Sequence, residues 1–352
     1  MPFSLLPRPF LDQAPELIRR WTDLASRCGR PDPFCCTPAW QLAFHDAFAP
    51  SRPLFFQMEE ENLLAFAQMQ LSNGIPVLTP LETEWISGAP LLGPESDELL
   101  LAALPRIRAL FNGALPCILI GGMEKDSPVL QRLLSLREFR VIEQPESWQR
   151  SASLEGGMDG YLSRRSGNFR AKMKKAKRRA EENGIVFERH VPGSMEEADR
   201  LYARMLAVEE RSWKGMGRCG MTVPPSREFY QIMMRRLARN GCGRVMFAVQ
   251  DGRDVGFIFG GLAGAFYRGQ QFSYDNALRP LSVGDLLQLE QLSWLCGEGV
   301  RRYDMGMSDH PSMKYKEHWA ELEHSRHAWL LLPMRPAVIA PPHDAPAQKG
   351  SF

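Results

Sequence analysis

Residues 267–319, YRGQQFSYDNALRPLSVGDLLQLEQLSWLCGEGVRRYDMGMSDHPSMKYKEHW, decide how the second half of the chain is interpreted. The stretch begins with an aromatic and polar run that predicts a strand. A turn containing Gly284 follows, and then a segment whose leucines recur at helical spacing. The short run RRYDMGM predicts a second strand, and a basic-aromatic turn closes the unit. The predicted order is therefore strand, glycine-bearing turn, helix, strand and polar turn.

The turn before the predicted helix is a candidate phosphate site. A helix that begins directly after Gly284 presents free backbone N–H groups and the positive end of its dipole, which suits a pyrophosphate. Glycine also lets the backbone approach a phosphate without a Cβ clash. A single glycine before a helix is also a common structural turn, so the downstream residues must support this interpretation.

Composition favours an ordinary soluble protein of two domains. The chain has 352 residues, 44% hydrophobic and 24% charged residues, and a net charge of +2. Seven cysteines without CxxC spacing fit a reducing compartment better than a disulfide framework or a zinc site. No apolar run reaches the roughly 18 residues of a membrane helix, and the N-terminus lacks the pattern of a signal peptide. These features predict a cytoplasmic protein.

The order of periodic segments predicts an α/β (α+β) fold with two domains. Residues 1–150 alternate helices with a hairpin and a short buried strand, which indicates a mixed sheet flanked by helices. Residues 140–160 are rich in Ser and Gly and are interpreted as the boundary. Residues 151–333 contain a three-stranded antiparallel meander followed by the unit described above. The proline-rich tail, 334–352, is predicted to be disordered.

A strongly basic helix opens the second domain. Nine Lys or Arg residues lie between Arg164 and Arg179, whereas Phe169, Met173, Ala176 and Ala180 form one narrow apolar stripe. One interpretation is a solvated helix docked by that stripe. A second is a site for an anionic acceptor or for a phosphate group of a cofactor. A third is RNA, whose binding would weaken steeply with salt.

Several segments resemble a known family. The closing stretch 281–319, together with YLSRRSGNFRAKMKKAKRRAEENG (161–184) and EERSWKG (209–215), resembles the BioF2-like (CelD/BcsL-type) acetyltransferases of the GCN5-related N-acetyltransferase superfamily. More distantly, the chain is similar to the FemAB-type aminoacyl transferases. Val283 replaces a proline that is usual in the first family. Ala320 replaces a glycine that is frequent in the second.

The resemblance implies two tandem acetyltransferase-like domains, each a mixed, largely antiparallel sheet flanked by helices, with the first degenerate. It implies an acyl-CoA, such as acetyl-CoA, as co-substrate and no metal. Its pyrophosphate would lie at Ser282, Val283, Gly284, Asp285 and Leu286, and its pantetheine along Phe272, Ser273 and Tyr274. The acyl group would pass directly to an amine or hydroxyl of a small molecule or of a saccharide, peptide or cell-envelope precursor.

Catalysis requires a base beside the thioester. The candidate catalytic residues are Glu210, Tyr274 and Lys316: Tyr274 to protonate the leaving thiolate, and Lys316 because it matches an aromatic-Lys position of the relatives. Other carboxylate candidates are Glu209, Asp275 and Asp304. Trp213 is expected to form the core or the cleft wall.

The sequence also bears on metal binding, on nucleic-acid binding and on a protein without catalytic activity. His310, His318, His324 and His327 lack partners at ligand spacing, so no metal site is predicted. The low net charge argues against nucleic acid, although a tRNA-borne donor stays open for a FemAB-like enzyme. A non-catalytic binding module is the third alternative. Neither the acceptor nor the oligomeric state follows from the sequence.

Overall fold

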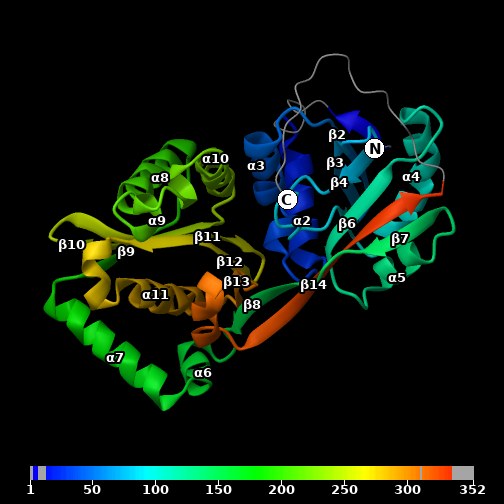
Figure 1. Ribbon diagram of the computed structural model, residues 1–352. Coiled ribbons are helices and arrows are strands. Elements are labelled where there is room, and N and C mark those ends of the chain that lie inside the picture. The colour runs from blue at the N-terminus through cyan, green and yellow to red at the C-terminus, as the bar shows by residue number, and fades with distance from the viewer. Residues whose placement is uncertain (1–2, 7–12, 310, 335–352) are drawn as a thin grey trace.

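The chain forms two lobes that share one long strand. The computed structural model describes residues 3–6, 13–309 and 311–334. The predicted tail lies outside these residues except for Met334. In Figure 1 the first half of the chain occupies the right-hand lobe, the second half occupies the left-hand lobe, and β14 (Leu322–Pro333) runs between them.

The first lobe contains the elements up to β7. Its strands are β1 (Ser4–Leu6), β2 (Leu54–Glu59), β3 (Asn62–Gln70), β4 (Pro76–Thr79), β5 (Leu91–Leu92), β6 (Cys117–Met123) and β7 (Phe139–Glu143). Its helices are α2 (Pro15–Arg27), α3 (Pro38–Phe48), α4 (Ser96–Leu110) and α5 (Pro128–Leu134), with a 3-10 turn η1 (Phe34–Cys36). Antiparallel pairs dominate, and the pair β4–β6 is parallel.

The second lobe contains the remaining elements. Its strands are β8 (Ser147–Ser153), β9 (Val186–His190), β10 (Gly243–Gln250), β11 (Arg253–Ala263), β12 (Phe266–Tyr274) and β13 (Arg302–Met307). Its helices are α6 (Gly157–Ser163), α7 (Gly167–Glu182), α8 (Met195–Glu209), α9 (Trp213–Met216), α10 (Ser226–Arg239) and α11 (Val283–Gly297), with 3-10 segments η2 (Gly220–Thr222), η3 (Asn276–Leu281) and η4 (Pro311–His318).

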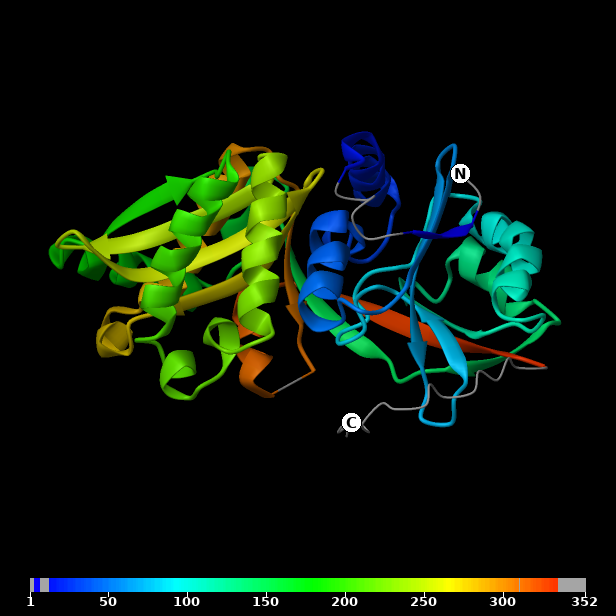
Figure 2. The same ribbon diagram turned by 90° about the horizontal axis from the view of Figure 1, so that it is seen from above.

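Alternating side chains along the meander build two cores. Successive residues of a strand point to opposite faces of its sheet. Val245 and Phe247 therefore join the core beneath α8 and α10, whereas Met246 and Ala248 join the core with α11 and α7. The apolar stripe of α7 is confirmed: Met173, Ala176 and Ala180 are buried. Figure 2 shows the sheet and the helices of this lobe from above.

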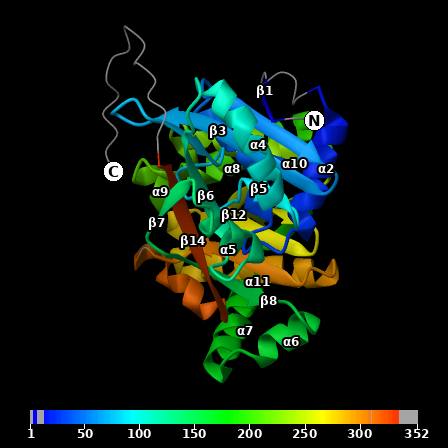
Figure 3. The same cartoon turned by 90° about the vertical axis from the view of Figure 1, so that its right-hand side faces the viewer.

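Strand β14 joins the two sheets into one. Its first part, Leu322–Arg326, pairs with β8 of the second lobe. Its later part pairs with β6 on one side and with β7 on the other. The resulting strand order is β1-β2-β3-β4-β6-β14-β8-β13-β12-β11-β10-β9. Figure 3 shows β14 lying between the strands of both lobes.

Aromatic and ionic contacts also hold the lobes together. The ring of Trp40 on α3 meets that of Phe229 on α10 edge to face, with centroids 5.1 Å apart. Asp32 of the first lobe pairs with Arg268 of β12, with Oδ2 and Nε 3.0 Å apart, and both side chains are buried. The Arg302 guanidinium donates to the Pro31 carbonyl at 2.6 Å. These polar contacts hold the segment at Pro31 and Asp32 of the first lobe against β12 and β13.

The structure confirms the predicted fold class, a mixed and largely antiparallel sheet flanked by helices. The Ser- and Gly-rich stretch 140–160, which was interpreted as the boundary, contains most of β7 and all of β8, and both strands pair with β14. Helix α8 ends at Glu209, and the Ser212 hydroxyl accepts from the amides of Lys214 and Gly215 at the start of the separate helix α9.

Candidate active site

The site begins where β12 and β13 separate. These parallel strands pair only at Phe266–Arg268 with Arg302–Asp304. Beyond that point, β13 carries a register shift between Asp304 and Gly306 in its pairing with β8. Gly306 has φ +79°, and a Cβ there would lie 2.1 Å from the Arg268 guanidinium. The bulge and the buried arginine therefore keep the two strands apart.

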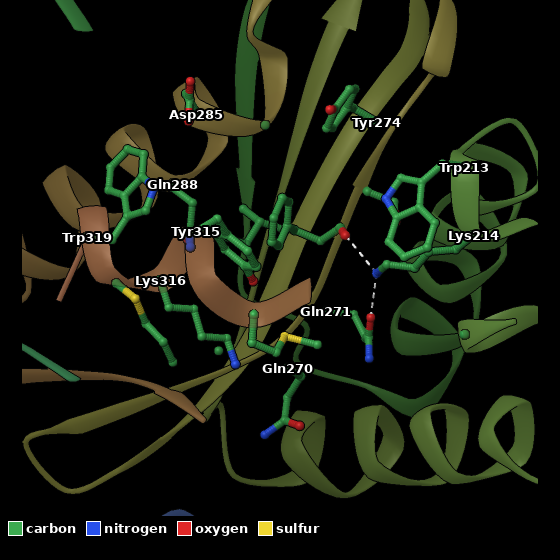
Figure 4. Close-up of a pocket in the computed structure, with 18 of the residues that line it drawn as sticks. Trp213, Lys214, Gln270, Gln271, Tyr274, Asp285, Gln288, Tyr315, Lys316 and Trp319 are labelled. Atoms are coloured by element: carbon green, nitrogen blue, oxygen red, sulfur yellow. Dashed lines mark hydrogen bonds between the residues drawn. The ribbon is translucent and has the colours of Figure 1, made fainter. Parts of the chain in front are cut away.

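A cavity of about 650 Å³ opens between the separated strands (Figure 4). Its walls come from β12, α11, β13, η4 and the segment around α9. The lining residues are Trp213, Lys214, Gly220, Ile258, Gly269, Gln270, Gln271, Phe272, Ser273, Tyr274, Arg279, Ser282, Gly284, Asp285, Gln288, Tyr303, Met305, Met313, Tyr315, Lys316 and Trp319. All of them belong to the second half of the chain.

The start of α11 forms one end of this cavity. Ser282 precedes the helix in the left-handed region (φ 58°, ψ 35°), which costs a non-glycine residue free energy and turns the chain sharply into α11. Gly284 allows close packing, because a Cβ there would lie 2.8 Å from Tyr274 Cε1. Asp285 lies in the first turn, and its carboxylate pairs with Lys172 of α7 at 2.8 Å.

Lys316 is a buried amine on the opposite wall. Only 6% of the residue is exposed, and its Nζ donates to the Met307 carbonyl at 2.5 Å. Burial, together with the buried guanidinium groups of Arg268 and Arg326, lowers the pKa of Lys316 to about 7. A lysine in this state is a base near neutral pH.

Neighbouring aromatic and amide side chains order the cavity. The Tyr315 ring meets Phe272 edge to face, with centroids 5.8 Å apart, and burial raises the pKa of Tyr315 to about 12. The Tyr303 hydroxyl donates to Gln288 Oε1 at 2.6 Å, which connects β13 to α11. Figure 4 shows Tyr315 and Gln288 among the residues that line the cavity.

A second lysine, which is half-buried, lies on the side of α9. Lys214 Nζ donates to Gln271 Oε1 at 2.7 Å and to the Phe272 carbonyl at 2.9 Å. Burial lowers the pKa of Lys214, against the opposing effect of Glu209. The fully buried Glu209 lies behind Gly220, and its Oε2 has no hydrogen-bond partner in the described structure. Lys214 therefore fixes the backbone of β12 beside the cavity.

The remaining carboxylate candidates lie away from the cavity lining. Glu210 is exposed. Asp275 pairs with Arg211 at 3.0 Å and with Arg253 at 3.3 Å. Asp304 is completely buried beside Arg302, and burial raises its pKa to about 7. Among the carboxylates proposed from the sequence for the site, the lining contains Asp285 alone.

The structure brings most of the predicted site residues together. Phe272, Ser273, Tyr274, Ser282, Gly284, Asp285 and Lys316 line the cavity, whereas Val283 and Leu286 are buried in the core below α11. Lys214 was not predicted from the sequence, although it lies in the segment 209–215 that resembles the family. Arg279, Gln271 and Gln288, whose isolated polar side chains carry no motif, were also not predicted.

The described ranges contain no group of three or more His, Cys, Asp or Glu side chains that could hold a metal ion. His310 lies outside them. The Ser151 hydroxyl and His324 Nε2 are hydrogen bonded at 2.8 Å, and His327 pairs with Glu143 and Glu146. Within the same ranges, none of the helices combines the length and apolarity needed to cross a membrane.

Most of the second lobe is similar to a known protein family. Residues 167–317 match the family model of an acetyltransferase (GNAT) domain. This range runs from the start of α7 into η4 and includes every cavity-lining residue except Trp319. This part of the chain is therefore similar to GNAT acetyltransferase domains. No curated protein matches the chain in sequence.

Solved structures share the fold over nearly the whole chain. FemX has 10% identity and a TM-score of 0.63, covering 88% of this chain and 95% of FemX. A conserved protein of unknown function from Bacteroides thetaiotaomicron has 10% identity and a TM-score of 0.60, covering 94% and 99%. The C-terminal domain of a protein described as a lysylphosphatidylglycerol synthetase, from Agrobacterium fabrum, has 11% identity and a TM-score of 0.56, covering 90% and 92%. At these identities the similarity concerns the fold alone.

Proposed function

We propose that the protein transfers an acyl group from an acyl-CoA, such as acetyl-CoA, directly to an amine or hydroxyl of a small molecule or cell-envelope precursor. The observation that supports this most strongly is the open side of β12 next to the start of α11. Beyond Arg268, β12 has no partner strand from β13, so a pantetheine chain can pair with residues 269–274 as an added strand would. The first turn of α11 then faces the pyrophosphate.

The side chains divide the reaction as follows. The acceptor nitrogen or oxygen attacks the thioester carbon, a new N–C or O–C bond forms, and the C–S bond breaks. Lys316 takes the proton of the acceptor, since its lowered pKa leaves part of it neutral near pH 7. Tyr274, which lines the cavity beside Gly284, returns a proton to the leaving thiolate. The exposed Glu210 is not needed in this scheme.

The first experiment is calorimetric titration of the whole chain with acetyl-CoA and longer acyl-CoAs at two salt concentrations. Binding that is lost in Gly284→Trp, with an unchanged circular dichroism spectrum, supports the site. Retained binding in that variant, or no binding of any acyl-CoA to the natural chain, contradicts it. The dependence on chain length identifies the acyl group that the cavity prefers.

An aminoacyl transfer from tRNA is the second candidate. The fold shared with FemX and with a protein described as a lysylphosphatidylglycerol synthetase favours it, together with the exposed lysines of α7. A donor that neutralises several lysines would lose orders of magnitude in affinity between low and high salt. Saturable acyl-CoA turnover without tRNA would exclude this candidate, and binding without turnover would favour the binding module. The seven free thiols fit a cytoplasmic location for either reaction.

A further inference from the structure

A second cavity, of about 500 Å³, lies in the first lobe and plays no part in the proposed transfer. It is bordered by the end of α2, the turn before α4 and the segment from β6 into α5. The lining residues are Leu24, Arg27, Cys28, Gly29, Arg30, Glu61, Gly93, Pro94, Glu124, Ser127, Pro128 and Val129. Charged and apolar side chains thus line the same cavity.

Arg30 is the unusual member of this set. Only 8% of the residue is exposed, yet no carboxylate in the described part of the chain pairs with its guanidinium. Nη2 donates to the Leu91 carbonyl at 3.1 Å and Nη1 to the Ser127 hydroxyl at 3.4 Å, while Nε has no partner in the described structure. A buried cation without a counter-ion is strongly unfavourable. An anion bound in the cavity would remove that cost.

The other walls indicate what the anion carries. Glu61 and Glu124 bring negative charge to the same cavity, and Arg27 already pairs with Glu61 at 3.4 Å. A second cationic group on the ligand would therefore be favourable near the glutamates. Leu24 and Val129 are buried apolar side chains on the remaining wall.

From this arrangement we infer that the first lobe binds a small zwitterion of the α-amino acid class with an apolar side chain. The carboxylate pairs with the Arg30 fork, whose planar donors match two carboxylate oxygens. The ammonium group faces Glu61 and Glu124, and the apolar side chain contacts Leu24 and Val129. The site is independent of the cavity between β12 and β13, so its occupation does not require acyl transfer.

The test is calorimetric titration of the whole chain, at constant ionic strength, with L-leucine, two analogues that each lack one of its charged groups, and inorganic phosphate. 4-Methylpentanoate retains the carboxylate, isoamylamine retains the amine, and inorganic phosphate provides a different anion. L-Leucine is expected to bind saturably, 4-methylpentanoate more weakly and isoamylamine not at all. Failure of both carboxylates to bind, or tighter binding of phosphate, would overturn the assignment.

Two variants test the role of Arg30. Arg30→Met is expected to weaken L-leucine binding by roughly 10- to 100-fold, which is the effect of a hydrogen-bonded charged group. Arg19→Met, at an exposed position of α2 outside the cavity lining, is the matched control and should change it less than about threefold. Equal binding by Arg30→Met and the natural chain would refute the site. If Arg30→Met does not fold, Arg30→Lys keeps the charge without the fork, and it too must bind more weakly.

Discussion

Each lobe contains a parallel pair of strands joined through a helix, and the two units differ at the start of that helix. In the second lobe β12, α11 and β13 surround an open cavity. In the first lobe β4, α4 and β6 have the same order. Asp97 in the first turn of α4 has only 1% of its side chain exposed and pairs with Arg132 of α5. Asp285 in the first turn of α11 is 27% exposed, and its partner Lys172 is 60% exposed.

This difference shows how one arrangement can serve structure or binding. The positive end of a helix attracts an anion, whether that anion belongs to the protein or to a ligand. In α4 the protein's own carboxylate occupies this end, and the segment after β6 covers it with an arginine. In α11 the acid is turned toward a solvated lysine, and the segment after β13 brings Tyr315 and Lys316 to the cavity. We therefore expect the start of α11 to bind a ligand. The carboxylate at the start of α4 is expected to contribute to the stability of the fold.

The largest expected effect is the loss of the base. Lys316→Met should reduce kcat by roughly 100- to 10,000-fold, because a positioned general base contributes about that factor. The acyl-CoA Kd should change far less, and single-turnover kinetics with titration separates the two. Lys314→Met, an exposed neighbour, is the matched control. Normal turnover by Lys316→Met would remove this residue from the mechanism.

The pH dependence of the rate is the second test. Because the pKa of Lys316 is lowered to about 7, the fraction of the lysine that is neutral increases as the pH rises through 7. The value of kcat/KM should therefore rise about tenfold per pH unit below pH 7 and become constant above it. Stability should follow the same group. Between pH 7 and about 10 the unfolded state binds the proton that the folded state has lost, so unfolding becomes harder as pH rises. Lys316→Met should flatten both dependences, and a rate independent of pH from 6 to 8 would contradict the assignment.

The third test converts the open helix start into a closed one. Ser282→Glu adds a carboxylate before α11, as Glu95 provides before α4. Repulsion of the phosphates should weaken acyl-CoA binding by roughly 10- to 100-fold, more at low salt than at high salt. Ser282→Gln has the same size without the charge and is the control. If both variants bind equally, shape rather than charge governs this end of the cavity.

The smallest effect is expected at the start of α4, where the protein's own carboxylate occupies the end of the helix. Asp97→Asn removes the buried charge that pairs with Arg132 and should lower the midpoint of thermal unfolding by a few degrees. The acyl-CoA Kd should stay within about twofold, because none of the cavity-lining residues belongs to the first lobe. A large change in Kd would show that the two lobes are energetically coupled.

Local patterns predicted most of the fold. The apolar residues of α7 have the spacing of a helix, and those of the hairpin β2–β3 and the meander β10–β12 have the spacing of strands. This periodicity was sufficient to predict the three elements. Strands β7 and β8 were missed because β7 leaves most of its side chains exposed and carries no apolar alternation. Their order comes from backbone pairing to β14, which lies far away in sequence.

The site was predictable only where one residue type implies one chemistry. Gly284 and Lys316 were proposed because a glycine before a helix and an aromatic-lysine pair are local signals, and both line the cavity. The low pKa of Lys316 was not predictable, because it depends on Arg268 and Arg326, which come from other strands. Arg268 is itself held by Asp32, about 230 residues earlier in the chain.

Strand β14 also has a consequence for biosynthesis. It is made after every other strand that the structure describes, yet it lies in the middle of the joined sheet. A nascent chain that has not reached Leu322 therefore exposes unpaired edges at β6 and at β8, and neither lobe can complete its sheet until β14 has been made. Open edges invite pairing with other chains, so this interval is when chaperone binding or aggregation would compete with folding.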